Sequence, residues 1–286
     1  MNNLLTFACI ASFVFAGNAM AQSGEAQTPK TAGKPFMVFD NMGYEGKPDL
    51  SKAGLIPSCV IGERADWKKA ISAGQLPDEA SFKEAVKSSA AGCPGPVVID
   101  IEYVYLSNTH GTTDAAVSNH FKLFITLARW AHEAAPGHIV GYYGHGLFPE
   151  EPGIQYTAQA SELLSAVDAF FPSMYVYGNE TPAQWKTKLQ SLVQKAREIA
   201  PSKPVYPYVW PQYHEGEPKA LEFVDGDYMK FQLETARDCG ADGVVFWSSH
   251  LSSHKIAWKN APWNEAMLKF VAEKPVCNSD VKLNQP

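Results

Sequence analysis

The segment PVVIDIEY, Pro96 to Tyr103, decides how the rest of this chain is interpreted. Its apolar, β-branched run is typical of a buried strand, and the run is followed by two carboxylates, Asp100 and Glu102. Residues of a strand alternate between its two faces, so side chains two positions apart leave the same face. Burying either charge inside the strand would be costly, and we therefore expect both acids to emerge side by side where the strand ends.

Short apolar runs alternate with longer amphipathic segments from Pro35 onward. The apolar runs predict strands at residues 36–40, 59–63, 96–102, 138–144, 169–176, 204–210 and 243–247. The amphipathic segments predict helices at residues 66–72, 78–89, 114–135, 158–167, 182–199, 227–239 and 264–271. This alternation is typical of parallel strands joined by crossover helices. No phosphate-binding glycine motif follows a strand, so we expect an α/β fold consisting of a single distorted (β/α) TIM-like barrel with about seven or eight parallel strands.

The amino-terminal stretch MNNLLTFACIASFVFAGNAMAQ has an apolar run followed by Ala19-Met20-Ala21. This pattern predicts a signal peptide over residues 1–21, followed by a flexible polar lead over residues 22–34 and a catalytic barrel domain over residues 35–286. The expected location is secreted or periplasmic, with no membrane association after the signal is removed. The net charge of −6 gives no electrostatic reason to expect nucleic acid as a partner.

Signal removal would take Cys9 away and leave an even number of cysteines, namely Cys59, Cys93, Cys239 and Cys277. In an exported protein such a set predicts one or two disulfides, with the pairing left open. The chain has neither a C-x-x-C motif nor a G-x-S-x-G motif, so it gives no support to a zinc site or a serine hydrolase. We expect neither a metal nor an organic cofactor.

Acidic and aromatic residues gather at or just beyond the carboxyl ends of the predicted strands. They are Asp40, Asp100, Glu102, Tyr142, Tyr143, Tyr175, Tyr177, Tyr208, Trp210, Tyr213 and Trp247. Active sites of (β/α) barrels lie at that rim. Aromatic faces cover the C–H surfaces of pyranose rings, and paired carboxylates suit glycosidic bond cleavage. The pattern therefore predicts a glycoside hydrolase whose partner is a polysaccharide or another glycan.

Five motifs, in order, resemble the hyaluronidase family of glycoside hydrolases: VIDIE, GYYG (141–144), FPSMY (171–175), PVYPYVWPQY (204–213) and GVVFW (243–247). The resemblance implies a retaining, substrate-assisted mechanism. It makes Glu102, with a partly desolvated carboxyl, the general acid and then the general base, while Asp100 holds the 2-acetamido group of the substrate. It also implies that Tyr143 and Tyr175 orient that group and that Trp247 forms the aromatic wall beside it.

The chain departs from the family pattern after the D-x-E pair. The family typically has Trp-Arg there, whereas this chain has Tyr103-Val104-Tyr105. The substrate therefore stays open between hyaluronan and another glycan that contains N-acetylhexosamine. Two further readings also stay open: a lysozyme-like muramidase, which would pair the D-x-E with Asp40, and a non-catalytic glycan-binding barrel.

Overall fold

The computed structural model describes residues 34–62, 64–107, 111–144, 158–215, 218–249 and 256–273. All paired strands in these ranges are parallel: β1 (Met37–Asn41), β2 (Ile56–Pro57), β3 (Cys59–Gly62), β4 (Val97–Asp100), β5 (Val140–Tyr142), β6 (Tyr208–Val209) and β7 (Gly243–Trp247). The predicted signal peptide and nearly all of the predicted lead lie outside the described residues.

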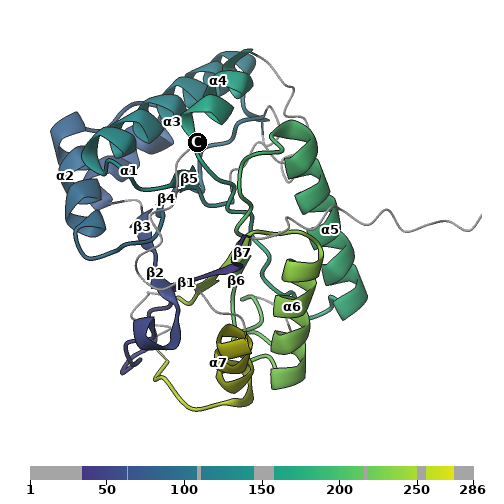
Figure 1. Ribbon diagram of the computed structural model, residues 1–286. Helices are drawn as coiled ribbons and strands as arrows, with labels where there is room; N and C mark the ends of the chain where they lie inside the picture. Colours follow the sequence, from purple (N-terminus) through teal and green to yellow (C-terminus); the bar gives the residue numbers. More distant parts are fainter. Residues whose placement is uncertain are drawn as a thin grey trace, which may run out of the picture.

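Helices cover the outside of the strands, as Figure 1 shows. They are α1 (Ala65–Ser72), α2 (Glu79–Ala90), α3 (Asp114–Ala134), α4 (Ala158–Ala166), α5 (Pro182–Ile199), α6 (Gly226–Asp238) and α7 (Pro262–Glu273), with a short 3-10 turn, η1 (Ser51–Ala53). Every predicted helix is confirmed to within a few residues. The agreement has local causes: α3 buries its periodic stripe of Phe121, Phe124 and Leu127, and α5 begins with a capping box between Thr181 and Gln184.

The strands form two parallel sheets, in the orders β2-β1-β7-β6 and β3-β4-β5. The segment 56–62 links them, because Ile56 pairs with Phe39 of β1 and Cys59 pairs with Val97 of β4. On the other side, segment 169–176 bridges β5 through Tyr143 and Phe171, and it bridges β6 through Ser173 and Tyr208. The sheets and bridges thus follow one another in a ring, which confirms the predicted barrel-like α/β fold.

Two predicted strands are less regular than expected. Segment 169–176 pairs only through isolated bridges, because Pro172 in its middle has no N–H to donate to a ladder. The predicted strand 204–210 shortens to β6, which lies between Pro207 and Pro211. The closeness of β5 to segment 169–176 depends on Gly141, where a Cβ would lie 2.6 Å from the carbonyl oxygen of Ala169.

Side chains of each strand alternate between its two faces, so the buried apolar residues form two separate clusters. The interior cluster fills the barrel and contains Met37, Phe39, Val98, Ala169, Phe171, Tyr175, Tyr206, Tyr208, Trp210 and Val245. The larger outer cluster packs the other strand faces against the helices, for example through Val38, Ile99 and Val140. A side chain's position relative to these clusters shows whether it faces the barrel interior.

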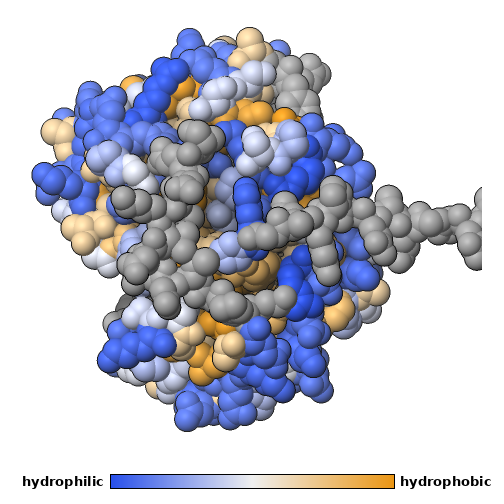
Figure 2. Space-filling model, in the orientation of Figure 1, coloured by the Kyte–Doolittle hydropathy of each residue, from blue (hydrophilic) through white to orange (hydrophobic). Residues whose placement is uncertain are grey.

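A disulfide joins Cys59 of β3 to Cys93 in the connection before β4. Cys239 is a buried free thiol, and Cys277 lies outside the described residues. The prediction of at least one disulfide is confirmed. The helices with assigned positions include none long and apolar enough to cross a membrane. Their outward surfaces are largely hydrophilic in the view of Figure 2.

Candidate active site

Asp100 and Glu102 lie where β4 reaches the carboxyl rim of the barrel. Val98 belongs to the interior cluster, so Asp100, two residues later, continues on the inward face and is half-buried. Glu102 stands beyond the strand and is exposed, whereas the family resemblance implied a partly desolvated carboxyl. The strand thus ends in one acid at the barrel mouth and another in contact with solvent.

Tyr143 connects the two acids electrostatically. Burial raises the pKa of the Tyr143 hydroxyl well above its ordinary value, and the negative charges of Glu102 and Asp100 raise it further. That hydroxyl donates a hydrogen bond to Oγ of Ser173 over 3.2 Å. Both carboxylates therefore act on the same protonated phenol.

Tyr143 begins an aromatic wall that continues across the barrel mouth. Its ring is 5.9 Å from that of Tyr175, which stacks on Trp247 with centroids 5.3 Å apart. Trp210 meets Trp247 edge to face at 4.9 Å. These four residues, called the aromatic wall below, come from segment 169–176, from β7 and from the positions directly after β5 and β6, so only the folded barrel brings them together.

Tyr175 and Tyr208 lie deeper in the barrel. Burial raises the pKa of both hydroxyls well above the ordinary value, and the charge of Asp100 acts in the same direction. Such phenols stay protonated at physiological pH. Tyr208, predicted to bind substrate, is buried within the interior cluster, 4.9 Å from the ring of Tyr143, and packs under that ring.

Gln212 fixes one end of the aromatic wall, and its role had no sequence signal. Its buried Oε1 accepts hydrogen bonds from Nε1 of Trp210 at 3.2 Å and from the hydroxyl of Tyr44 at 3.0 Å. Its Nε2 donates to the carbonyl of Leu221 over 2.7 Å. Since the bonds to Trp210 and Tyr44 are buried, Trp210 is held in one orientation.

Asp40, which the sequence predicted as a substrate-binding residue, lies apart from this constellation. Phe39 faces the interior, so Asp40 faces outward, where it forms an ion pair with Lys47 and accepts a bond from the backbone N–H of Met42 at 3.1 Å. The next residue, Asn41, takes the inward position. It pairs in register with Trp247 and donates to the carbonyl of Ser58 over 3.0 Å.

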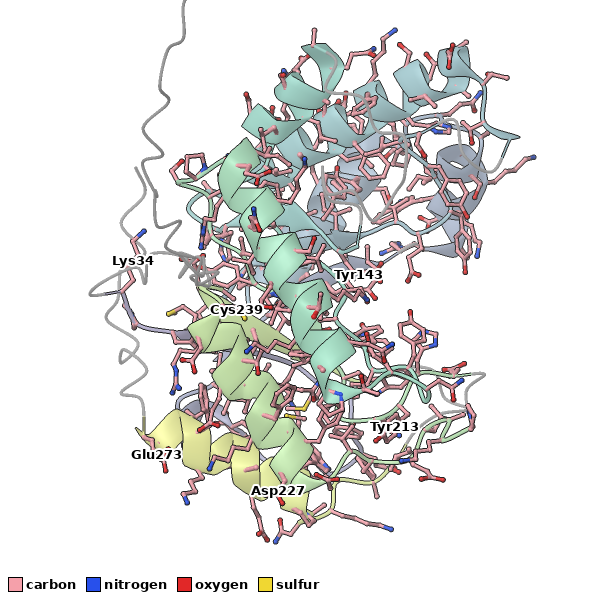
Figure 3. All side chains as sticks on the ribbon, turned by 90° about the vertical axis from the view of Figure 1, so that its right-hand side faces the viewer. Lys34, Tyr143, Tyr213, Asp227, Cys239 and Glu273 are labelled. Carbon is pink, nitrogen blue, oxygen red and sulfur yellow. A yellow bond between two sulfur atoms is a disulfide. The ribbon has the colours of Figure 1, made fainter. Side chains whose placement is uncertain are left out.

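Tyr142 and Tyr213, also predicted to bind substrate, belong to the outer packing. Tyr142 is buried against α3, where its hydroxyl donates to the carbonyl of Phe124 over 2.6 Å. Tyr213 packs on the outer cluster, and Nζ of Lys219 lies 5.0 Å from its ring centre. Figure 3 shows Tyr143 and Tyr213 on one side of the molecule. Lys34 and Cys239, which come before β1 and β7, lie on the opposite side.

Tyr177 lies at the edge of the site, beside a histidine that the sequence analysis missed. Its exposed ring stacks on His214 with centroids 4.9 Å apart. The His214 ring is also 6.1 Å from Tyr175 and 6.0 Å from Trp210. Within the described ranges, no group of three or more His, Cys, Asp or Glu side chains is placed to hold a metal ion.

Together these features define a parallel α/β barrel with acids and an aromatic wall at its carboxyl rim. Neither a protein-family model nor a curated protein sequence matches the chain. Solved structures do match. Bee venom hyaluronidase superposes with a TM-score of 0.55 at 18% identity, covering 75% of this chain and 91% of that one.

The same venom enzyme, in complex with a hyaluronic acid tetramer, gives a TM-score of 0.57 at 18% identity over 82% of this chain and 94% of that one. Alpha-L-fucosidase isoenzyme 2 from Paenibacillus thiaminolyticus gives 0.50 at 12% identity, covering 83% of this chain and 43% of that one. At these identities the similarity concerns the fold. The chain therefore has a barrel fold that it shares with glycoside hydrolases.

Proposed function

We propose that this protein is a retaining glycoside hydrolase that cleaves a glycan containing N-acetylhexosamine. The observation that supports it best is the meeting of Asp100, Glu102 and Tyr143 beside the aromatic wall. Tyr143 and Trp247, the two half-buried members of the wall, offer aromatic surface for a sugar ring, and the buried Tyr175 and Trp210 support them. The acids supply the proton donor and the hydrogen-bond acceptor that cleavage needs.

In the first proposed step Glu102, in its protonated form, gives its proton to the glycosidic oxygen as the bond from that oxygen to the anomeric carbon breaks. The carbonyl oxygen of the substrate's 2-acetamido group forms the new bond to the anomeric carbon. Asp100 accepts the hydrogen bond of the acetamido N–H and balances the positive charge of the cyclic intermediate. Tyr143 remains protonated and can donate its hydroxyl hydrogen to the same group in exchange for its bond to Ser173.

In the second step Glu102, now a carboxylate, takes a proton from water. The water oxygen attacks the anomeric carbon, the bond to the acetamido oxygen breaks, and the amide is restored. The configuration at the anomeric carbon is therefore retained. Its exposed position gives Glu102 direct access to both the leaving oxygen and the incoming water.

The muramidase alternative required Asp40 to act with the D-x-E pair. Asp40 faces away from the barrel interior and is bonded to Lys47 and Met42, so the structure does not favour that reading. A non-catalytic glycan-binding barrel would use the same aromatic wall, and turnover assays separate it from the proposal.

The test is to incubate the protein with hyaluronan, chondroitin, chitin oligomers and peptidoglycan. We expect release of reducing ends from at least one, and a loss of at least about 100-fold in kcat for Glu102→Gln. Glu84→Gln, which changes an exposed carboxyl on α2, is the matched control. Equal turnover by Glu102→Gln and the parent would refute the role of Glu102, and binding without any turnover would favour the non-catalytic reading.

We also propose that residues 1–21 are removed on export. Amino-terminal sequencing of the mature protein should begin at Gln22. A mature chain that still starts at Met1 would contradict this.

A further inference from the structure

Tyr103 is the most exposed of the large apolar side chains in the described residues. Its exposed fraction is 62%, compared with 44% for Leu76 and 38% for Tyr177. Single exposed apolar residues are common and need no explanation by themselves. Tyr103 differs because it directly follows Glu102 at the rim and belongs to neither apolar cluster.

A lysine holds the ring of Tyr103 in place. Nζ of Lys68, in the first half of α1, lies 4.6 Å from the ring centre. A cation at this distance occupies one face of an aromatic ring and favours one orientation of it. Given the large exposed fraction, the opposite face of the ring is left toward solvent. Tyr177 differs, because His214 stacks on its ring and Lys188 lies 5.6 Å from its centre.

The order of the strands shows on which side of β4 Tyr103 lies. β4 lies between β3 and β5. Tyr143 follows β5, whereas the partner of Tyr103 is on α1, the helix that follows β3. Tyr103 and the aromatic wall therefore lie on opposite sides of the strand that ends in Asp100 and Glu102.

We propose that Tyr103, oriented by Lys68, is a second sugar-binding subsite, on which the neighbouring pyranose of the glycan stacks while the cleaved residue lies against the aromatic wall. This inference rests on the proposed function and deepens it, because it assigns the two sides of the scissile bond to two separate surfaces. The uncovered tyrosine face contacts the C–H surface of the sugar. Lys68 acts through Tyr103 as a positioning residue.

The test measures binding in the non-hydrolysing Glu102→Gln background, by titration calorimetry with the dimer and hexamer of N-acetylglucosamine and with the tetramer and octamer of hyaluronan. Adding Tyr103→Ala should weaken binding of the longer oligomers about tenfold, through loss of one aromatic contact, and change binding of the shortest much less. Tyr103→Phe should preserve the affinity. Lys68→Met should weaken binding of the longer oligomers by a smaller factor.

Leu76→Ala is the control, since it removes a comparably exposed apolar side chain from the connection between α1 and α2. Equal affinity of Tyr103→Ala and its parent for every oligomer that binds would overturn the subsite and leave the proposed function intact. A uniform loss for short and long oligomers would also overturn it. Failure of the parent to bind either series would count against the proposed function and the subsite together.

Discussion

The ring of Tyr175 lies nearly parallel to the indole of Trp247, with centroids 5.3 Å apart and planes 24° apart. The two residues come from segment 169–176 and from β7, which are separated in the ring of strands by β6. Trp210 of the intervening region packs edge-on to both and is anchored by Gln212. A wall supported in this way is rigid before a ligand arrives, which reduces the ordering cost of binding.

Tyr143→Phe and Tyr142→Phe form a matched pair of neighbouring substitutions. We expect Tyr143→Phe to lower kcat by about 10- to 100-fold, because it removes a donor at the site, and to cost less stability than Tyr142→Phe, because its lost bond to Ser173 is only partly buried. Tyr142→Phe should instead lower the free energy of unfolding by about 1 kcal/mol at unchanged kcat, because it removes the bond to Phe124. Urea unfolding and steady-state kinetics check both, and the reverse pattern would refute the assignment of inward and outward faces.

Asp40→Asn should affect folding rather than catalysis. It removes the partly buried ion pair with Lys47, so we expect the free energy of unfolding to fall by about 1–2 kcal/mol. The activity of the folded fraction should not change. Asp49→Asn, at an exposed site, controls for the loss of one negative charge. A large fall in kcat without a loss of stability would return Asp40 to the catalytic machinery.

Gly141→Ala should be strongly destabilising. The added Cβ would lie 2.6 Å from both the carbonyl oxygen of Ala169 and the ring of Phe171, so β5 and segment 169–176 would have to separate. We expect a loss of about 1–3 kcal/mol, as for other overpacked cores. Gly62→Ala is the control, because nothing lies within 4 Å of its added Cβ. Thermal unfolding of the two variants decides the matter, and equal midpoints would be inconsistent with this contact.

Removing the Cys59–Cys93 disulfide should destabilise the chain by about 2–4 kcal/mol, because the bond closes a loop with a sequence separation of 34. The double variant Cys59→Ser, Cys93→Ser should show this in urea unfolding. The control is Cys239→Ser, which makes the same cysteine-to-serine change at a buried free thiol. Identical stability of the parent under reducing and oxidising conditions would contradict the expectation.

The buried tyrosines also predict how stability changes in alkali. Burial raises the pKa values of Tyr143, Tyr175 and Tyr208, so the unfolded chain loses these protons near pH 10 while the folded chain keeps them. Their contribution is complete below about pH 10 and falls by about 1.4 kcal/mol per pH unit for each tyrosine as the pH rises toward the folded values.

Urea unfolding across this pH range, followed together with tyrosinate absorbance, measures the effect. The buried tyrosines should ionise only as the chain unfolds, whereas the exposed Tyr103 should ionise in the folded protein. Ionisation of all tyrosines below the unfolding transition would contradict the assigned burial.

Local sequence patterns account for most of the helices, because an amphipathic period and a capping residue act within one segment. They also placed the strands that are continuous and β-branched. They missed β2, whose two residues carry no pattern, and they overstated segment 169–176, whose backbone pairing Pro172 interrupts. In the second case the hydrophobic pattern of a strand was present, but the backbone donors needed for a ladder were not.

The side chains that lie away from the expected site have a common cause. Asp40 was predicted at the site, but its neighbour Asn41 faces the interior; of the predicted pair Tyr142 and Tyr143, only Tyr143 does. Neighbouring residues of a strand point to opposite sides, so a register uncertainty of one residue exchanges a core position for a site position. Gln212 and His214 had no local pattern at all, since their partners are distant aromatic residues.

By itself, the sequence determined the alternation of strands and helices and the two acids at the end of β4, because periodicity and the cost of burying charge are local properties. Only the tertiary structure decided which tyrosines line the barrel mouth, that Glu102 is exposed, and that Tyr103 stands beside Lys68. These facts depend on contacts between strands and helices that are distant in the sequence, which form only when the chain is folded.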